Sequence, residues 1–250
     1  MMSQDIYGNK KHNGKGMGFR MIDDKDRIIC ALDFDDPARA RRLVEELGEL
    51  VNFYKVGMLM QFMGGREIIS WLLEKGKKVF LDMKYYDIPE TVASVVKQVA
   101  QTGVHFLTIH GNSKIIEQAV EARGDSALKL MAITVLTSMD ADDMQELGLS
   151  CSVKDMVLYR VGKAIDFGCD GIITSGREAG MIKQNFGQKI ITVTPGIRPS
   201  GTDLHEHKRS VTPREAIKSG ADYLVIGRPI YQSPDPRKAV GEIREEIMIS

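Results

Sequence analysis

Short apolar segments rich in β-branched and aromatic residues recur along the chain from residue 27 onward. Eight of these segments are too brief for buried helices and have the composition of β-strands. The first five begin 25 or 26 residues apart, which leaves room for one helix between neighbours. The predicted strands are 28–32, 53–56, 79–81, 105–109, 131–135, 171–174, 190–193 and 223–226.

Amphipathic patterns fill the intervals between the predicted strands. Thr212 is a suitable N-cap for a helix that starts at Pro213. Eight alternating strand–helix units favour an α/β fold of the (β/α)8 TIM-barrel type over a doubly wound sheet. Apolar residues follow the i, i+3, i+4, i+7 spacing of a helix face at two places, Ala40, Leu43, Val44, Leu47 and Val92, Val95, Val96, Val99.

The domain organisation follows from the same pattern. The barrel is expected to occupy residues 27–250 as a single domain, with no linker inside it. Residues 1–26 form an N-terminal extension that we expect to be disordered, because its glycines follow no strand and lack phosphate-loop spacing. The longest interval between strand starts, from 131 to 171, predicts an extra helix or a flexible loop over the active face.

Composition and charge narrow the range of possible functions. The 250 residues carry 34 Lys and Arg against 34 Asp and Glu, so no bulk attraction to nucleic acid or membrane is expected. The sequence contains no apolar run near 18 residues, the length of a membrane-spanning helix. Three scattered cysteines without a CxxC pair predict neither a disulfide framework nor a zinc site, and favour a reducing cytoplasm.

Charged residues gather at the ends of the first three predicted strands. Asp33 follows the first strand, Lys55 lies in the second, and Asp82 and Lys84 end the third. In a (β/α)8 barrel the active site lies at these carboxyl ends. Strand alternation directs Asp82 and Lys84 inward if the apolar pair Leu81 and Met83 faces the helices. Structural ion pairing that closes the barrel is the alternative interpretation, but four charges exceed that need.

A second concentration of candidate residues follows the seventh and eighth strands. The segments Thr194–Pro199 and Gly227–Pro229 each combine glycine with arginine. Loops after these two strands are the usual phosphate position of the fold, where exposed amides and a guanidinium suit a dianion. Ordinary Gly/Pro turns with exposed arginines are the alternative interpretation. Because both loops carry glycine and arginine, we expect a phosphorylated ligand.

The histidines and aromatic residues add little. His205 and His207 form an HxH pair without an obvious complete set of metal ligands around it. His110, at the end of a predicted strand, is placed to line the pocket, while His105 is expected to pack. One Trp, seven Tyr and eight Phe show no stacking platform for nucleic acid.

Over about residues 27–240 the sequence resembles the orotidine 5′-phosphate decarboxylase family. One shared element is DxKxxD, here Asp82, Lys84 and Asp87, and it becomes specific together with the GIRP and IGRPI elements. The matching segments are 31–33, 55–57, 82–89, 136–138, 193–199 and 220–230.

The resemblance implies decarboxylation of orotidine 5′-phosphate to UMP in pyrimidine biosynthesis, without a metal or organic cofactor. It implies that Lys84 delivers a proton to C6 of the pyrimidine, that Asp82 lies against the substrate carboxylate, and that Asp33 and Lys55 bind the ribose side. It also implies a homodimer in which Asp87 and Thr91 reach the partner's site. The remaining implied binding residues are Ile88, Thr137, Ser138, Pro195, Arg198, His207, Gly227 and Arg228.

The chain departs from the family pattern at three positions: Tyr86 replaces a histidine, Glu90 an asparagine, and His207 a glutamine. Two alternatives remain open. One is a metal-dependent sugar-phosphate lyase of the same superfamily, of the 3-keto-gulonate-phosphate decarboxylase type. It uses a glutamate after the second strand to help hold magnesium, where this chain carries Lys55. The other is a barrel that binds a phosphorylated ligand without turnover.

Overall fold

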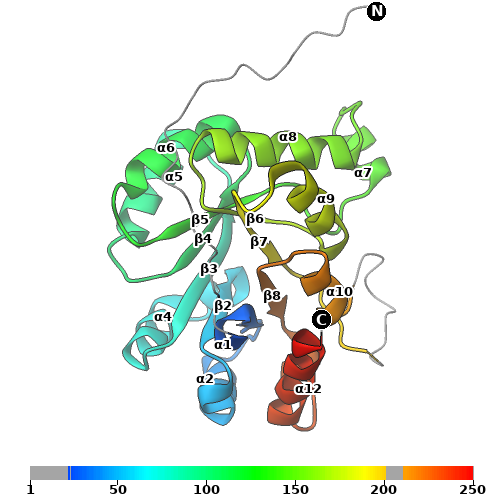
Figure 1. The fold of residues 1–250 in the computed structure, drawn as a ribbon. Coiled ribbons are helices and arrows are strands. Elements are labelled where there is room, and N and C mark those ends of the chain that lie inside the picture. The colour runs from blue at the N-terminus through cyan, green and yellow to red at the C-terminus, as the bar shows by residue number, and fades with distance from the viewer. Residues whose placement is uncertain (1–21, 23, 201–210, 250) are drawn as a thin grey trace, which may run out of the picture.

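A computed structural model describes residues 22, 24–200 and 211–249 of the chain (Figure 1). Within these residues eight parallel strands close into a barrel in chain order, and helices surround it. The first strand closes the barrel by pairing with the last, Ile28 opposite Leu224. The predicted (β/α)8 barrel is therefore confirmed. The strands are β1 (Ile28–Ala31), β2 (Phe53–Gly57), β3 (Lys78–Tyr85), β4 (Phe106–His110), β5 (Lys129–Ile133), β6 (Gly171–Ile173), β7 (Ile191–Thr194) and β8 (Tyr223–Ile226).

The helices follow the predicted intervals, and the interval after β5 holds two helices, α7 and α8, so an extra helix is present there. The helical elements are α1 (Asp24–Arg27), α2 (Pro37–Leu47), η1 (Gly48–Leu50), α3 (Met58–Phe62), α4 (Gly65–Glu74), α5 (Pro89–Val99), α6 (Ser113–Arg123), α7 (Ala141–Glu146), α8 (Val153–Asp166), α9 (Gly176–Phe186), α10 (Pro213–Lys218), α11 (Arg228–Tyr231) and α12 (Pro236–Met248).

Local signals in the sequence start and stop these helices. Thr212 caps α10 by accepting the Glu215 amide hydrogen bond, and the Glu215 carboxylate accepts one from the Thr212 amide. Glycine ends several helices with a positive φ, as at Gly168 after α8, where a side chain would be strained. Glu90 lies in the first turn of α5, where the helix dipole favours a negative charge.

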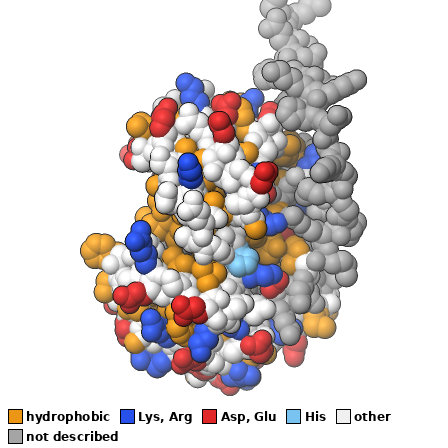
Figure 2. Space-filling model, turned by 90° about the vertical axis from the view of Figure 1, so that its left-hand side faces the viewer, with side chains coloured by type: hydrophobic (Ala, Val, Ile, Leu, Met, Phe, Trp, Pro, Cys, Tyr) orange, Lys and Arg blue, Asp and Glu red, His pale blue; other side chains and the backbone are white. Residues whose placement is uncertain are grey.

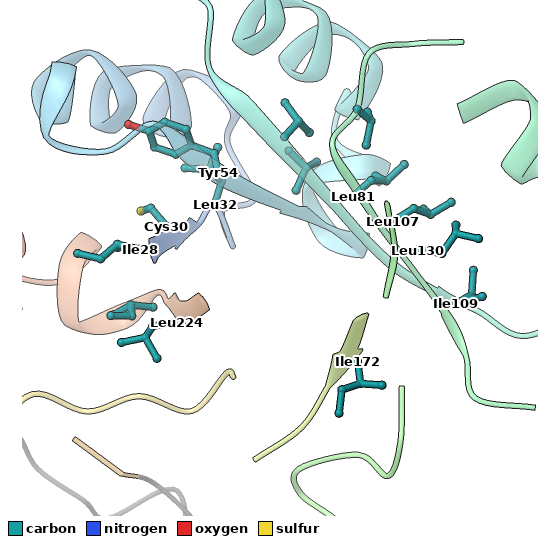
Figure 3. Close-up of a cluster of buried hydrophobic side chains, with 14 of the residues drawn as sticks. Ile28, Cys30, Leu32, Tyr54, Leu81, Leu107, Ile109, Leu130, Ile172 and Leu224 are labelled. Atoms are coloured by element: carbon teal, nitrogen blue, oxygen red, sulfur yellow. The ribbon is translucent and has the colours of Figure 1, made fainter. Parts of the chain in front are cut away.

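Two apolar layers hold the barrel together. Outward-pointing strand residues meet the helices in one continuous core, of which Tyr54, Leu81, Leu107 and Ile172 are examples (Figure 3). A separate inner core fills the barrel itself. It consists of Ile29, Ala31, Phe53, Phe80, Phe106, Met131, Ile191, Val193 and Val225, with Ile173 and Tyr223 packed against it.

Aromatic rings dominate the amino-terminal end of the inner core. Phe53, Phe106 and Tyr223 are the first residues of β2, β4 and β8, and their ring centroids lie 4.9–6.0 Å apart. Phe80 packs edge-on against Phe106 at 6.0 Å. Because side chains on one face alternate along a strand, the next inward positions are Lys55, Asp82 and Thr108. The polar layer of the barrel therefore rests directly on the aromatic one.

A short helical turn precedes β1. Asp24–Arg27 form this turn, α1, and Asp26 pairs with Lys78 at the start of β3. The turn overlaps the last residues of the predicted extension, and the ion pair ties Asp26 to β3. Residues 1–21 and 23, which carry the rest of the predicted extension, lie outside the described part.

The surface matches the balanced composition. On the face shown in Figure 2, acidic and basic side chains are interspersed, and hydrophobic side chains gather toward the middle. No helix among the described residues is long and apolar enough to span a membrane.

Candidate active site

Four charged side chains of alternating sign meet at the carboxyl ends of β1, β2 and β3. Lys55 Nζ lies 2.8 Å from Asp33 Oδ1 and 3.7 Å from Asp82 Oδ2. Lys84 Nζ donates to the same Asp82 oxygen at 2.8 Å. The order Asp33–Lys55–Asp82–Lys84 therefore forms a chain of three ion pairs. The structure brings together the four charges that the sequence pointed to.

Burial differs along this ion-pair chain. The side chains of Lys55 and Asp82, its inner members, are 10% and 12% exposed, whereas Asp33 and Lys84 are 47% and 37% exposed. Partly buried charges are tolerated when each has an opposite partner and good hydrogen bonds. Two carboxylates and two ammonium groups also leave the cluster neutral overall. The accessible ends are an ammonium and a carboxylate that can meet a ligand.

A bulge in β3 creates the position of Lys84. Leu81 pairs with Leu107 and Tyr85 with Ile109, so Thr108 alone faces three residues of β3. Lys84 has a φ of +54°, in the left-handed region that side chains other than glycine rarely adopt. Its amide donates to Thr108 Oγ1 at 2.8 Å, and that hydroxyl donates to Asp82 Oδ1 at 3.0 Å.

Thr108 was not among the site residues predicted from the sequence. Its signal was present, since alternation along β4 places it between inward-facing Phe106 and His110. What the sequence could not supply is the shift of register that sets Thr108 opposite both Asp82 and Lys84.

Two glycines allow the backbone to approach the charges closely. A Cβ at Gly57, the last residue of β2, would lie 3.0 Å from Lys55 Nζ and 3.3 Å from Asp33 Oδ1. A Cβ at Gly227 would lie 3.8 Å from Asp33 Oδ2. The loop after β8 therefore passes directly beside the outer end of the ion-pair chain.

The arginines after β7 and β8 lie close enough to influence each other. Burial, together with the positive charge of Arg228, lowers the pKa of Arg198. The Arg198 amide donates to the Val211 carbonyl, and Gly196 before it has a φ of +78°. Two neighbouring guanidinium groups beside a glycine turn suit an anion with two negative charges.

Tyr231 lies near both the ion-pair chain and the two arginines. It was not among the site residues predicted from the sequence. It lies one helical turn after Gly227, and its ring packs on Phe34 with centroids 4.9 Å apart. Burial first, and then the charge of Asp33, raise the pKa of Tyr231, while Arg228 and Arg198 oppose the shift. The charges of Asp33 and the two arginines therefore all act on Tyr231.

The remaining expected base-side residues line the same end of the barrel without joining the ion-pair chain. Thr137 is half-buried and Ser138 exposed, both between β5 and α7, and Pro195 is half-buried after β7. No hydrogen bond between described residues connects Thr137 or Ser138 to the four charges. His205 and His207 lie outside the described residues.

The residues expected to reach a partner are exposed in the structure. Asp87 and Thr91 are both exposed, as is Ile88. Asp87 Oδ1 accepts the Ile88 amide hydrogen bond at 2.6 Å, and Asp87 takes no part in the ion pairs between described residues. Their own chain therefore leaves these side chains accessible to a second one.

A second titratable cluster lies beside Tyr86, in the segment that follows β3. The His110 ring stacks on Tyr86 with centroids 3.9 Å apart, and its buried Nδ1 has no hydrogen-bond partner among the described residues. Arg160, on α8, donates to the Thr134 carbonyl. Burial, with a smaller contribution from the Arg160 charge, lowers the pKa of His110 to about 4. His110 is therefore a neutral ring at pH 7.

The fold and this site define a (β/α)8-barrel protein with a lysine–carboxylate centre and a pair of arginine-bearing loops. A sequence model described as the orotidine 5′-phosphate decarboxylase / HUMPS family matches residues 26–243. The chain belongs to this family, and the resemblance noted from its motifs is confirmed.

Individual relatives agree with the family match. The chain is 47% identical over 223 residues to an orotidine 5′-phosphate decarboxylase of Nitrobacter winogradskyi, covering 89% of this chain and 93% of that protein. It is 44% identical to one of Methylococcus capsulatus, covering 89% and 92%. Among solved structures, orotidine 5′-phosphate decarboxylase from Lactobacillus acidophilus superposes with a TM-score of 0.78 at 34% identity, covering 89% and 99%.

The pKa of His110 generates a prediction about stability and pH. In the unfolded chain His110 takes up a proton below about 6.5, whereas in the folded chain it stays neutral down to about 4. The unfolded state therefore binds more protons in this window, and stability falls as pH falls from 6.5 toward 4. His110→Phe keeps a ring on Tyr86 and has no proton to bind, so the variant should lose less stability over this range.

Urea unfolding of both proteins at pH 7 and pH 4.5 measures this difference directly. The free energy of unfolding of the variant should rise relative to that of the natural chain at the lower pH. An equal fall in both proteins would show that His110 is already protonated in the folded state.

Proposed function

We propose that this protein decarboxylates orotidine 5′-phosphate to UMP, with Lys84 as proton donor and without a cofactor. The observation that carries the proposal is the alternating ion-pair chain, in which an accessible ammonium lies 2.8 Å from a largely buried carboxylate. The family match and the relatives at 44–47% identity support the substrate. Family, fold and side-chain chemistry point to the same reaction.

The proposed chemistry needs only one proton. The bond between C6 and the substrate carboxylate breaks, its electron pair stays on C6, and carbon dioxide leaves. Lys84 Nζ then gives a proton to C6 and later regains one from water, so UMP forms with net uptake of one proton. An ammonium held next to the developing carbanion stabilises charge that appears only in the transition state.

Asp82 has two tasks in this proposal. Its Oδ2 accepts the hydrogen bond from Lys84 Nζ at 2.8 Å, which fixes the direction of the proton donor. Its negative charge also lies where the substrate carboxylate would bind, and that repulsion is relieved when carbon dioxide leaves. Lys55, 3.7 Å from the same oxygen, moderates the repulsion.

The other residues would bind the parts of the substrate that do not react. Asp33 and Lys55 would bind the ribose hydroxyls, Thr137 and Ser138 the base, and Ile88 and Pro195 would contribute apolar surface. Arg198, Arg228 and the amide of Gly227 would hold the 5′-phosphate, with His207 as a further donor. Such remote contacts supply binding energy that helps the reaction at C6.

We further propose a homodimer in which Asp87 and Thr91 complete the partner's site. Large apolar side chains are exposed in two segments that follow the paired strands β2 and β3, and neighbouring strands bring those segments to one end of the barrel. Exposed apolar side chains in this number are typical of an interface. They are Met58, Leu59, Phe62 and Met63 in the first segment and Tyr86 and Ile88 in the second.

The cysteines support a reducing compartment, and we propose the cytoplasm. Cys30 and Cys169 are buried free thiols whose pKa burial raises to about 12, so they resist oxidation.

The sugar-phosphate lyase of the same superfamily is the competing function. A glutamate after the second strand would be needed there to hold magnesium, but β2 carries Lys55. Its ammonium lies between the carboxylates of Asp33 and Asp82, where it repels a divalent cation. Binding without turnover is disfavoured by the accessible Lys84 ammonium, which a phosphate-binding barrel does not need.

Release of carbon dioxide from orotidine 5′-phosphate in excess EDTA tests the function. We expect turnover to be unchanged by the chelator, because Lys55 occupies the place of a metal ligand. Activity that vanishes with EDTA and returns with magnesium would favour the lyase, and no turnover under any condition would favour simple binding.

Replacing Arg228 with Ala tests the phosphate site. An arginine–phosphate contact is worth about 1.5–3 kcal/mol, so kcat/KM for orotidine 5′-phosphate should fall about ten- to hundredfold. Turnover of the unphosphorylated nucleoside should hardly change. Equal losses for both substrates would assign Arg228 to the fold instead.

Mixed dimers test the shared site. Lys84→Ala and Asp87→Ala homodimers should each be nearly inactive. When the two variants are unfolded and refolded together, about half the dimers are mixed and each has one intact site, so about a quarter of wild-type activity should return. Each variant refolded alone is the control. No gain after mixed dimers have been demonstrated would place Asp87 and Lys84 in one chain's site.

A further inference from the structure

Thr108 stands at the point where the β3–β4 pairing is interrupted. The pairs Leu81–Leu107 and Tyr85–Ile109 flank the interruption, so β3 carries two more residues than β4 across it. The extra length of β3 holds Asp82 and Lys84. Thr108 is fully buried, and it is the β4 residue opposite this extra length.

The hydrogen bonds of this hydroxyl have a fixed direction. Thr108 Oγ1 accepts from the Lys84 amide at 2.8 Å. Its single proton is then directed to Asp82 Oδ1 at 3.0 Å. The other oxygen of Asp82 is left for the two lysine ammonium groups. The two oxygens of Asp82 therefore have different partners: Oδ1 accepts from Thr108, and Oδ2 faces the two lysines.

The same contact stabilises an unfavourable backbone. Lys84 has a φ of +54°, a conformation that persists in residues with a Cβ only when the surroundings enforce it. Because the bulge removes the regular ladder partner of the Lys84 amide, the Thr108 hydroxyl is the group that satisfies it. The conformation in turn directs the Lys84 side chain back over Asp82.

We propose that Thr108 is a positioning residue for the reaction: its hydroxyl holds the Lys84 backbone and the Asp82 carboxylate in the relative orientation that proton delivery requires. This inference rests on the proposed decarboxylation. Thr108 does not itself touch the substrate, so its loss should slow the chemical step and leave substrate binding largely intact.

Two variants distinguish the contribution of the Thr108 hydroxyl from that of its methyl group. Thr108→Val keeps the shape and removes both hydrogen bonds, whereas Thr108→Ser keeps the hydroxyl and removes a methyl group. We expect kcat for orotidine 5′-phosphate to fall about 10- to 100-fold in the Val variant, as for a lost hydrogen bond to a charged group. KM should stay within about threefold. The Ser variant should keep kcat within about threefold of wild type. If the Val variant does not fold, Thr108→Ala replaces it in the comparison with Ser.

Thr192→Val is the matched control. Thr192 is also fully buried, and its hydroxyl lies 3.0 Å from both the Gly220 carbonyl and Asp222 Oδ2, near the amino-terminal ends of β7 and β8. Its replacement should lower the melting temperature and leave kcat of the folded protein unchanged. A fall in kcat of the same size in this control would show that buried threonines act through stability alone.

Besides an equal fall in the control, three results at Thr108 would overturn the inference: unchanged kcat in the Val variant, an equal loss in the Ser variant, or a rise in KM without a change in kcat. A wild-type protein that releases no carbon dioxide would overturn the proposed function, and this inference with it. The two failures are therefore distinguishable.

Discussion

The charges at the mouth of the barrel can share that space only if their signs alternate. Lys55 and Asp82 are nearly buried, and each has an oppositely charged neighbour on both sides. Removing water from an unpaired charge is unfavourable by several kcal/mol, so the alternation makes the arrangement tolerable. The surrounding structure follows from it: Gly57 lacks the Cβ atom that would crowd Lys55 and Asp33, and Thr108 donates a hydrogen bond to the second oxygen of Asp82.

β3 shows how a regular fold accommodates an irregular site. Its first half follows the barrel geometry, with Phe80 in the inner core and Leu81 against the helices. Its second half leaves that geometry at the bulge, where Lys84 takes its left-handed conformation. Strain of this kind is concentrated at functional sites because the remaining structure is stable enough to impose it. The seven other strands carry no such break in the pairings they make with one another.

The sequence predicted the architecture because hydrophobic period and spacing depend on local geometry alone. Eight strands are present, each beginning within two residues of the predicted start, and the largest difference is at β5, which begins at Lys129 rather than Met131. The position of Asp33, Lys55, Asp82 and Lys84 was likewise predictable, since parallel strands in a closed barrel bring their carboxyl ends together.

Contacts between segments that are distant in the sequence were harder to predict. The role of Thr108 depends on a register shift, the stacking of Tyr86 on His110 depends on how two loops fold together, and the proximity of Arg198 to Arg228 depends on the exit directions of two strands. None of these leaves a periodic trace in the sequence. Family resemblance supplied some of the missing roles, but it gave no sign of Thr108 or Tyr231.

The rings of Phe53, Phe80, Phe106 and Tyr223 close the barrel beneath the ion-pair chain. Side chains therefore fill the barrel interior below Lys55 and Asp82, and no second route through the described residues leads to the ion-pair chain from the amino-terminal end. In the proposed reaction, substrate would enter and product would leave by the same route, at the carboxyl-terminal end of the barrel.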